Sequence, residues 1–281
     1  MPYIELDGHA HFYEDDDFTD PWKPAEAIWI QHGWGRSSQF FYHWVPPLAG
    51  TYRVLRRDFR GHGKTFDPAP DHRWTIEELL ADMRGFLDQL GLERVHYVGD
   101  STGGILGAIF ASRWPERFKS LTMMSTPIAD PSRNSIRNYG YENTVVALDT
   151  MTMDEKVAAT IRGRGMSVLS PEHEKWVYAE WRKNRVSSLQ GMARLYPNVD
   201  ITDVLPNVRT PTLVLAPSNS PTAPLAEQRR MKEMIPGACL EVIEGIGHEI
   251  FVDAADSCLK ALKEFIGRVS RNELAVKRLR P

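Results

Sequence analysis

Long apolar runs, cysteine-rich patterns and an excess of one charge are all missing from this 281-residue sequence. No run approaches a membrane span and the first residues are not basic, so we expect a cytoplasmic protein that does not bind membranes. Only two cysteines are present, without metal-ligand spacing, which predicts reduced thiols and no metal. A formal net charge of −3 gives no electrostatic reason to bind nucleic acid.

The composition is that of an ordinary globular protein, 42% hydrophobic and 25% charged, and predicts one large α/β domain with an insertion. Strand-like and helix-like segments alternate. Two strands flank Asp7-Gly8, a dipeptide favoured in tight hairpins. The expected strands are 3–6, 9–13, 27–30, 53–56, 95–98, 118–124, 212–215 and 240–243, and the expected helices are 79–90, 104–112, 224–234 and 253 onward. This alternation predicts a mostly parallel sheet covered by helices on both faces.

The alternation stops after Pro127. From about 129 to 198 the chain has helix-forming residues with interspersed Trp, Tyr and Met, and no strand pattern. We therefore expect a helical cap at 129–198, inserted into a core made of 1–128 and 199–281. The large side chains of this cap either line a pocket for a hydrophobic substrate or form its own core; they are Trp176, Tyr178, Trp181 and Met192.

The most informative motif is Gly-Asp-Ser-Thr-Gly at 99–103, which follows an apolar run and leads into a helix-like run. A strand, a Gly-x-Ser-x-Gly turn and a helix together form a nucleophile elbow, in which small residues permit the sharp turn that exposes the serine hydroxyl. Ser101 is therefore the expected nucleophile of a hydrolase.

A nucleophilic serine needs a base and donors for the oxyanion. His248 follows the last expected strand, in a glycine-containing loop that could carry its ring over Ser101. The motif His-Gly-Trp-Gly at 32–35 follows the third strand, and its glycines let an amide point into the site. We assign the backbone N–H groups of Trp34 and Thr102 to the oxyanion hole. Thr102 is the residue after the nucleophile, and its amide lies at the N-terminus of the elbow helix, where the helix dipole favours negative charge.

These motifs resemble those of the α/β-hydrolase superfamily over essentially the whole chain. The matching segments are the hairpin at 6–8, the oxyanion loop at 32–35, the loop at 58–63 after the fourth strand, the elbow at 99–103, the strand at 211–215 and the histidine motif at 247–248. The resemblance implies an eight-stranded, mostly parallel sheet with an inserted helical cap. It says little about the substrate, because this fold hosts many chemistries.

One position departs from the family pattern. Members of the family usually carry an aspartate shortly after the strand at 211–215, whereas this chain has Ser220 there, beside Asn219. Some relatives carry the acid after the strand that follows the elbow helix, where the nearest carboxylate is that of Asp130. Three interpretations stay open: Asp130 orients His248, Asn219 or Ser220 does so without a charge, or the normal hydrolytic power is lost. The sequence favours a neutral orienter.

The sequence thus predicts a cofactor-free serine hydrolase that cleaves a small to medium carboxylic ester or lactone through an acyl-enzyme. An amidase or a C–C bond hydrolase would use the same groups, and a non-catalytic binding protein is the alternative from another class. The expected partner is a small-molecule ester, lactone or amide, and a homodimer is an open possibility.

Overall fold

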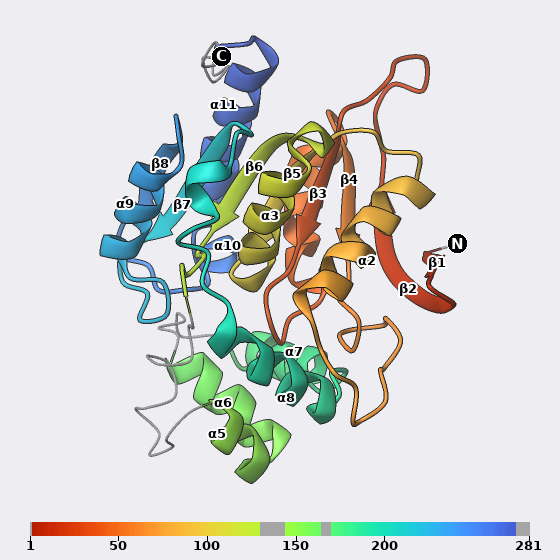
Figure 1. Cartoon of the computed structure of the whole chain (residues 1–281), viewed down its shortest axis with the longest axis vertical. Helices are drawn as coiled ribbons and strands as arrows, with labels where there is room; N and C mark the ends of the chain where they lie inside the picture. Colours follow the sequence, from red (N-terminus) through yellow and green to blue (C-terminus); the bar gives the residue numbers. More distant parts are fainter. Residues whose placement is uncertain (1, 130–143, 164–169, 274–281) are drawn as a thin grey trace.

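The computed structural model describes residues 2–129, 144–163 and 170–273. Its centre is an eight-stranded sheet in the order β1-β2-β4-β3-β5-β6-β7-β8 (Figure 1). The strands are β1 (Tyr3–Leu6), β2 (His9–Asp16), β3 (Ala27–Gln31), β4 (Arg53–Arg57), β5 (Val95–Asp100), β6 (Phe118–Met124), β7 (Thr212–Pro217) and β8 (Cys239–Ile243). The antiparallel pairs are β1–β2 and β2–β4, and all other pairs are parallel, which confirms the predicted fold class.

The opening hairpin has the tight turn that its sequence predicts. Asp7 and Gly8 both have positive φ, 50° and 76°, and Leu6 pairs directly with His9. Two central residues with positive φ are typical of the turn whose twist matches that of the flanking strands.

Helices cover both faces of the sheet. The first face carries α2 (Ile76–Gln89), α3 (Thr102–Arg113) and α9 (Leu225–Met234). The second carries the 3₁₀ segment η1 (Ser38–Trp44), α1 (Val45–Ala49), α10 (Ile250–Asp253) and α11 (Ala255–Ser270). Within β3, Trp29 packs into the first core cluster, whereas Ile28 and Ile30 pack into the second. This alternation explains why the first four residues of β3, 27–30, are all apolar, since the strand is buried on both faces.

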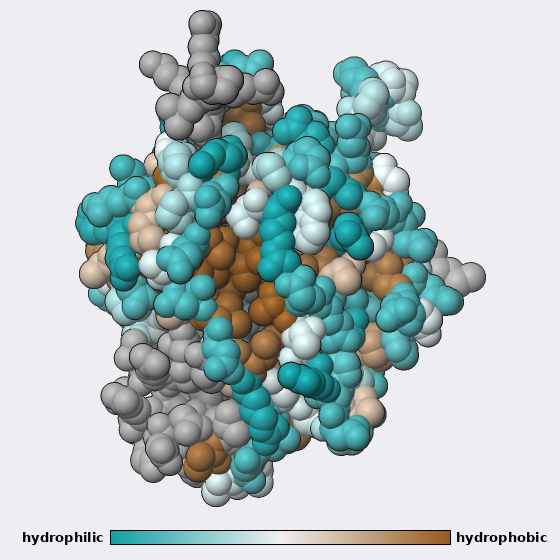
Figure 2. Space-filling view, in the orientation of Figure 1, coloured by the Kyte–Doolittle hydropathy of each residue, from teal (hydrophilic) through white to brown (hydrophobic). Residues whose placement is uncertain are grey.

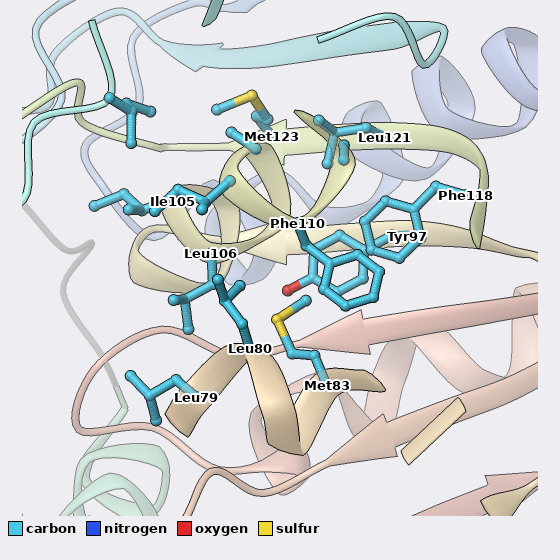
Figure 3. Close-up of a cluster of buried hydrophobic side chains, with 14 of the residues drawn as sticks. Leu79, Leu80, Met83, Tyr97, Ile105, Leu106, Phe110, Phe118, Leu121 and Met123 are labelled. Carbon is cyan, nitrogen blue, oxygen red and sulfur yellow. The ribbon is translucent and has the colours of Figure 1, made fainter. Parts of the chain in front are cut away.

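The first core cluster holds the elbow helix against the sheet. Figure 3 shows Ile105, Leu106 and Phe110 of α3 among side chains of β5, β6 and α2. All the residues from Thr102 to Ala111 of this helix are buried. The apolar packing on every side fixes α3, and so fixes the turn that precedes it.

Between β6 and β7 the described part of the chain contains helices and no strand. The α-helices are α5 (Thr144–Thr150), α6 (Met153–Gly163), α7 (Pro171–Trp181) and α8 (Val186–Leu195), and the 3₁₀ turns η4 (Tyr196–Asn198) and η5 (Leu205–Asn207) follow them. The α-helices lie beyond the carboxyl ends of the parallel strands (Figure 1). The helical segment from α5 to α8 falls within the cap predicted at 129–198, whose boundaries stay a prediction.

The outer surface is mixed in polarity. Figure 2 shows one face of the molecule, on which hydrophobic side chains gather near the centre and mainly hydrophilic side chains surround them. Among the described helices, none combines the length and the apolar character needed to cross a membrane.

Candidate active site

Ser101 occupies a strained turn between β5 and α3. Its φ and ψ are 50° and −113°, a combination that non-glycine residues rarely adopt and that concentrates at functional sites. A Cβ on Gly99 would lie 2.5 Å from backbone atoms of Gly103 and Gly104, and a Cβ on Gly103 would lie 2.5 Å from the carbonyl oxygen of Gln31. The two glycines therefore allow the close backbone approach that a nucleophile elbow requires.

The backbones of His248 and Ser101 are both hydrogen-bonded to the chain at the carboxyl end of strand β6. The Ser101 amide donates a hydrogen bond to the carbonyl oxygen of Met124, the last residue of β6, at 2.8 Å. The hydroxyl of the next residue, Ser125, donates to the carbonyl oxygen of His248 at 2.7 Å. Met124 and Ser125 thus hold the backbones of the two candidate catalytic residues, Ser101 and His248. The side chains of Ser101 and His248 are both buried.

Two hydroxyl groups contact the imidazole of His248. Thr222 Oγ1 lies 2.7 Å from His248 Nδ1, and Ser220 Oγ lies 3.0 Å from the same nitrogen. Asn219 is exposed, and its backbone amide donates to the carbonyl oxygen of Ile246 at 3.0 Å. Of the two neutral candidates named from the sequence, the structure brings Ser220 to the ring and adds Thr222, which the sequence did not single out. Asp130 lies outside the described residues.

The segment His-Gly-Trp-Gly at 32–35 lies beside the elbow. A Cβ on Gly33 would lie 3.0 Å from Ser101 Cβ and 2.7 Å from Asp100 Oδ2, so the residue that precedes Trp34 is packed against the turn. Thr102 is the first residue of α3, where backbone N–H groups have no partner within the helix and the helix dipole favours negative charge. Their role as oxyanion donors stays a prediction.

His32 fixes this loop through a defined tautomer. Its Nε2 accepts a hydrogen bond from the Phe59 amide at 3.0 Å, so its Nδ1 carries the proton and donates to the carbonyl oxygen of Gly33 at 2.8 Å. Burial holds the pKa of His32 well below its usual value, which keeps the ring neutral. The loop after β4 is joined to the same region, because Asp58 accepts from the Ser38 amide at 2.6 Å.

A buried ion pair connects the two loops of the candidate site. Arg36 Nε donates to Glu249 Oε2 at 3.1 Å, and a second bond joins Arg36 Nη2 to Glu249 Oε1. Both side chains are 1% exposed, and the Arg36 guanidinium lies 5.1 Å from the Trp181 ring centre. Because removing both charges from water is costly, such a pair adds little net stability. Here it links the loop of Trp34 to the residue that follows His248.

The helical segment contacts the Trp34 loop directly. Trp34 Nε1 donates to the carbonyl oxygen of Leu189 in α8 at 3.1 Å. Asn184 Nδ2 donates to the carbonyl oxygen of Gly35, and the amide of Gly63 donates to Asn184 Oδ1, both at 3.2 Å. The Trp181 ring leaves no room for a Cβ on Gly35, which has a φ of 74°. Trp181 therefore packs against the core as well as within its own segment.

We predict that Asn184→Ala lowers kcat by about tenfold and changes KM less, because the Gly35 carbonyl and the Gly63 amide lose a buried partner. The melting temperature should also fall by a few degrees. Asn207→Ala is the matched control, since the side chain of Asn207 is exposed and donates a hydrogen bond to the Asp203 carbonyl oxygen. A normal kcat in a destabilised Asn184→Ala protein would show that this residue does not position the loop.

The described residues contain no group of three or more His, Cys, Asp or Glu side chains arranged to hold a metal ion. The residues of the candidate site offer a serine hydroxyl, an imidazole and backbone amides. Acyl transfer uses these three kinds of group together.

Comparison with known proteins agrees with the fold. Residues 26–255 match the family model described as alpha/beta hydrolase fold. The chain is 26% identical over 257 residues to "Putative carbamate hydrolase RutD" of Caulobacter sp. (strain K31), which covers 88% of this chain and 92% of that protein. It is also 26% identical over 265 residues to 2-hydroxy-6-oxo-2,4-heptadienoate hydrolase of Pseudomonas putida, covering 86% and 89%.

Among solved structures, the enol-lactonase from Burkholderia xenovorans LB400 matches with a TM-score of 0.83 and 23% identity. The match covers 95% of this chain and 100% of the enol-lactonase, and at this identity it shows the shared fold. Since the family model spans most of the chain, the chain belongs to the alpha/beta hydrolase fold family.

Proposed function

We propose that this protein is a serine hydrolase that cleaves a small to medium carboxylic ester or lactone through an acyl-enzyme. The observation that carries the proposal is the conformation of Ser101, a positive-φ serine between a buried strand and a buried helix. Membership of the family and the hydrolase names of its relatives support hydrolysis in general. The specificity for an ester or a lactone is our proposal.

In the proposed reaction the Ser101 hydroxyl attacks the acyl carbonyl carbon while its proton passes to His248 Nε2. The N–H groups of Trp34 and Thr102 stabilise the oxyanion that forms. His248 then gives the proton to the departing alkoxide, and the acyl group remains on Ser101. A water molecule, deprotonated by His248, attacks this acyl-enzyme, and the acid leaves as the Ser101 hydroxyl is restored.

A fluorophosphonate label tests the proposal, because only an activated serine reacts with it at a useful rate. We expect labelling of the peptide that contains Ser101 in the wild-type protein and its loss in Ser101→Ala. Ser112→Ala is the matched control, since Ser112 lies later on the same helix and donates to the carbonyl oxygen of Ile109. A wild-type protein that is neither labelled nor active would instead support a non-catalytic binding protein.

A substrate panel tests the bond that is cleaved. Purified protein is assayed with short and medium acyl esters, lactones, amides, carbamates and a C–C ring-cleavage product, since the named relatives include a carbamate hydrolase and a dienoate hydrolase. We expect kcat/KM to be highest for an ester or a lactone. A higher value for an amide, a carbamate or the C–C substrate would overturn the proposed specificity while leaving the serine mechanism in place.

A further inference from the structure

We propose that Thr222 is a positioning residue that, with Ser220, holds His248 in the tautomer needed for catalysis. This inference rests on the proposed function, because it assigns the partner of the proposed base. Both hydroxyl oxygens lie within hydrogen-bond distance of His248 Nδ1, at 2.7 Å for Thr222 and 3.0 Å for Ser220. All three side chains are buried, so these contacts are protected from competition by bulk water.

The hydrogen bonds of Ser220 limit what each hydroxyl can do. Ser220 Oγ accepts from the amide of Ala223 at 3.0 Å and from the amide of Thr222 at 3.3 Å. A hydroxyl oxygen has two lone pairs and one proton, so these amides use both of its acceptor positions. Ser220 therefore acts toward its remaining neighbours as a donor.

In this proposal Thr222 accepts the imidazole proton. Ser220 Oγ lies 3.3 Å from Thr222 Oγ1 and can donate its proton there. The other lone pair of Thr222 Oγ1 then accepts the proton of His248 Nδ1 over the shortest of these contacts. With Nδ1 protonated, Nε2 keeps its lone pair and can take the Ser101 proton.

This arrangement differs from a carboxylate partner in one respect. An ionised carboxylate can only accept hydrogen bonds, so it enforces the Nδ1-protonated tautomer, whereas a hydroxyl can also donate to Nδ1. The backbone amides that bind Ser220 restrict this freedom, because they hold Ser220 Oγ in place. Because Nδ1 carries a proton in this proposal, Ser220 cannot donate to the ring and donates to Thr222 Oγ1, while Thr222 accepts from the ring.

The kinetic test compares Thr222→Val, Thr222→Ser and Asp130→Asn. We expect Thr222→Val to lower kcat by about 10- to 100-fold with little change in KM, because it removes the acceptor while keeping a similar volume. Thr222→Ser should recover kcat to within about threefold, because it restores the hydroxyl. The matched control is Thr19→Val, since Thr19 lies in the loop between β2 and β3 and hydrogen-bonds to Asp17 there. The proposal is overturned if Thr222→Val keeps wild-type kcat, if Thr222→Ser is equally impaired, or if Asp130→Asn causes the larger loss.

A spectroscopic test separates this inference from the proposed function. The ¹⁵N spectrum of histidine-labelled protein, assigned with a His248→Gln variant, reports which ring nitrogen of His248 carries the proton in its neutral form. We expect Nδ1 to be protonated in the wild type and the Nε2-protonated form to appear in Thr222→Val. A wild-type ring protonated on Nε2 overturns the inference even in an active enzyme. If Nδ1 is protonated but fluorophosphonate does not label the protein, the inference about Thr222 and His248 is retained and the proposed function is rejected.

Discussion

Replacing Ser101 with alanine is expected to lower kcat by about 10⁴- to 10⁶-fold on whichever ester or lactone the protein cleaves best. The residual rate would come from substrate binding and the oxyanion donors, which the substitution leaves in place. The backbone should keep its shape, because the bond from the residue 101 amide to the carbonyl oxygen of Met124 needs no side chain. The loss should therefore be one of chemistry, with an unchanged circular-dichroism spectrum and a similar KM.

Steady-state kinetics with Ser112→Ala beside Ser101→Ala distinguish this loss from a general effect of removing a hydroxyl from α3. The control should keep nearly full activity, since its hydroxyl bonds only to a carbonyl of its own helix among the contacts described. If Ser101→Ala kept a tenth of the wild-type kcat, Ser101 would not be the nucleophile.

His248→Ala is expected to cost about as much as Ser101→Ala, and the double variant little more than either. The two side chains act as one unit in the proposed mechanism, so removing either one removes the activated nucleophile. The loop should stay in place, because Ser125 donates to the backbone carbonyl oxygen of His248 and this bond survives the substitution. Kinetics of the four proteins in a double-mutant cycle measure the coupling. Losses that multiply would mean that the two residues work independently, and would contradict the pairing.

The fold could be predicted largely from hydrophobic periodicity. Strand β6 has the predicted bounds, 118–124, because a buried run between turn residues is short and well delimited. Helix α2 starts earlier than the periodicity indicates, at Ile76, because the Thr75 hydroxyl accepts a hydrogen bond from the Glu78 amide and caps the helix. The Thr-x-x-Glu pattern at 75–78 was the signal that could have located this start.

The candidate site could be predicted only in part. Ser101 and the His-Gly-Trp-Gly segment sit in motifs whose spacing requires a particular turn, so the sequence alone indicates where they lie. Thr222 belongs to no such motif. It reaches His248 because the chain folds back after Ser220 in a loop that no periodicity describes, and the amides that hold Ser220 are themselves backbone groups. The partner of an imidazole depends on such local geometry, which composition and spacing do not encode.

The contacts that Asn184 makes with Gly35 and Gly63 limit how freely this part of the protein can be exchanged. A lid that only covers a pocket could be replaced by that of a relative to change selectivity, and the chimera would keep its turnover. Here the segment taken from a relative would also need an amide side chain at the position of Asn184 and an indole, like that of Trp181, that packs against Gly35. Diversification of this chain toward new substrates is therefore expected to proceed by point changes within the segment rather than by recombination of whole segments.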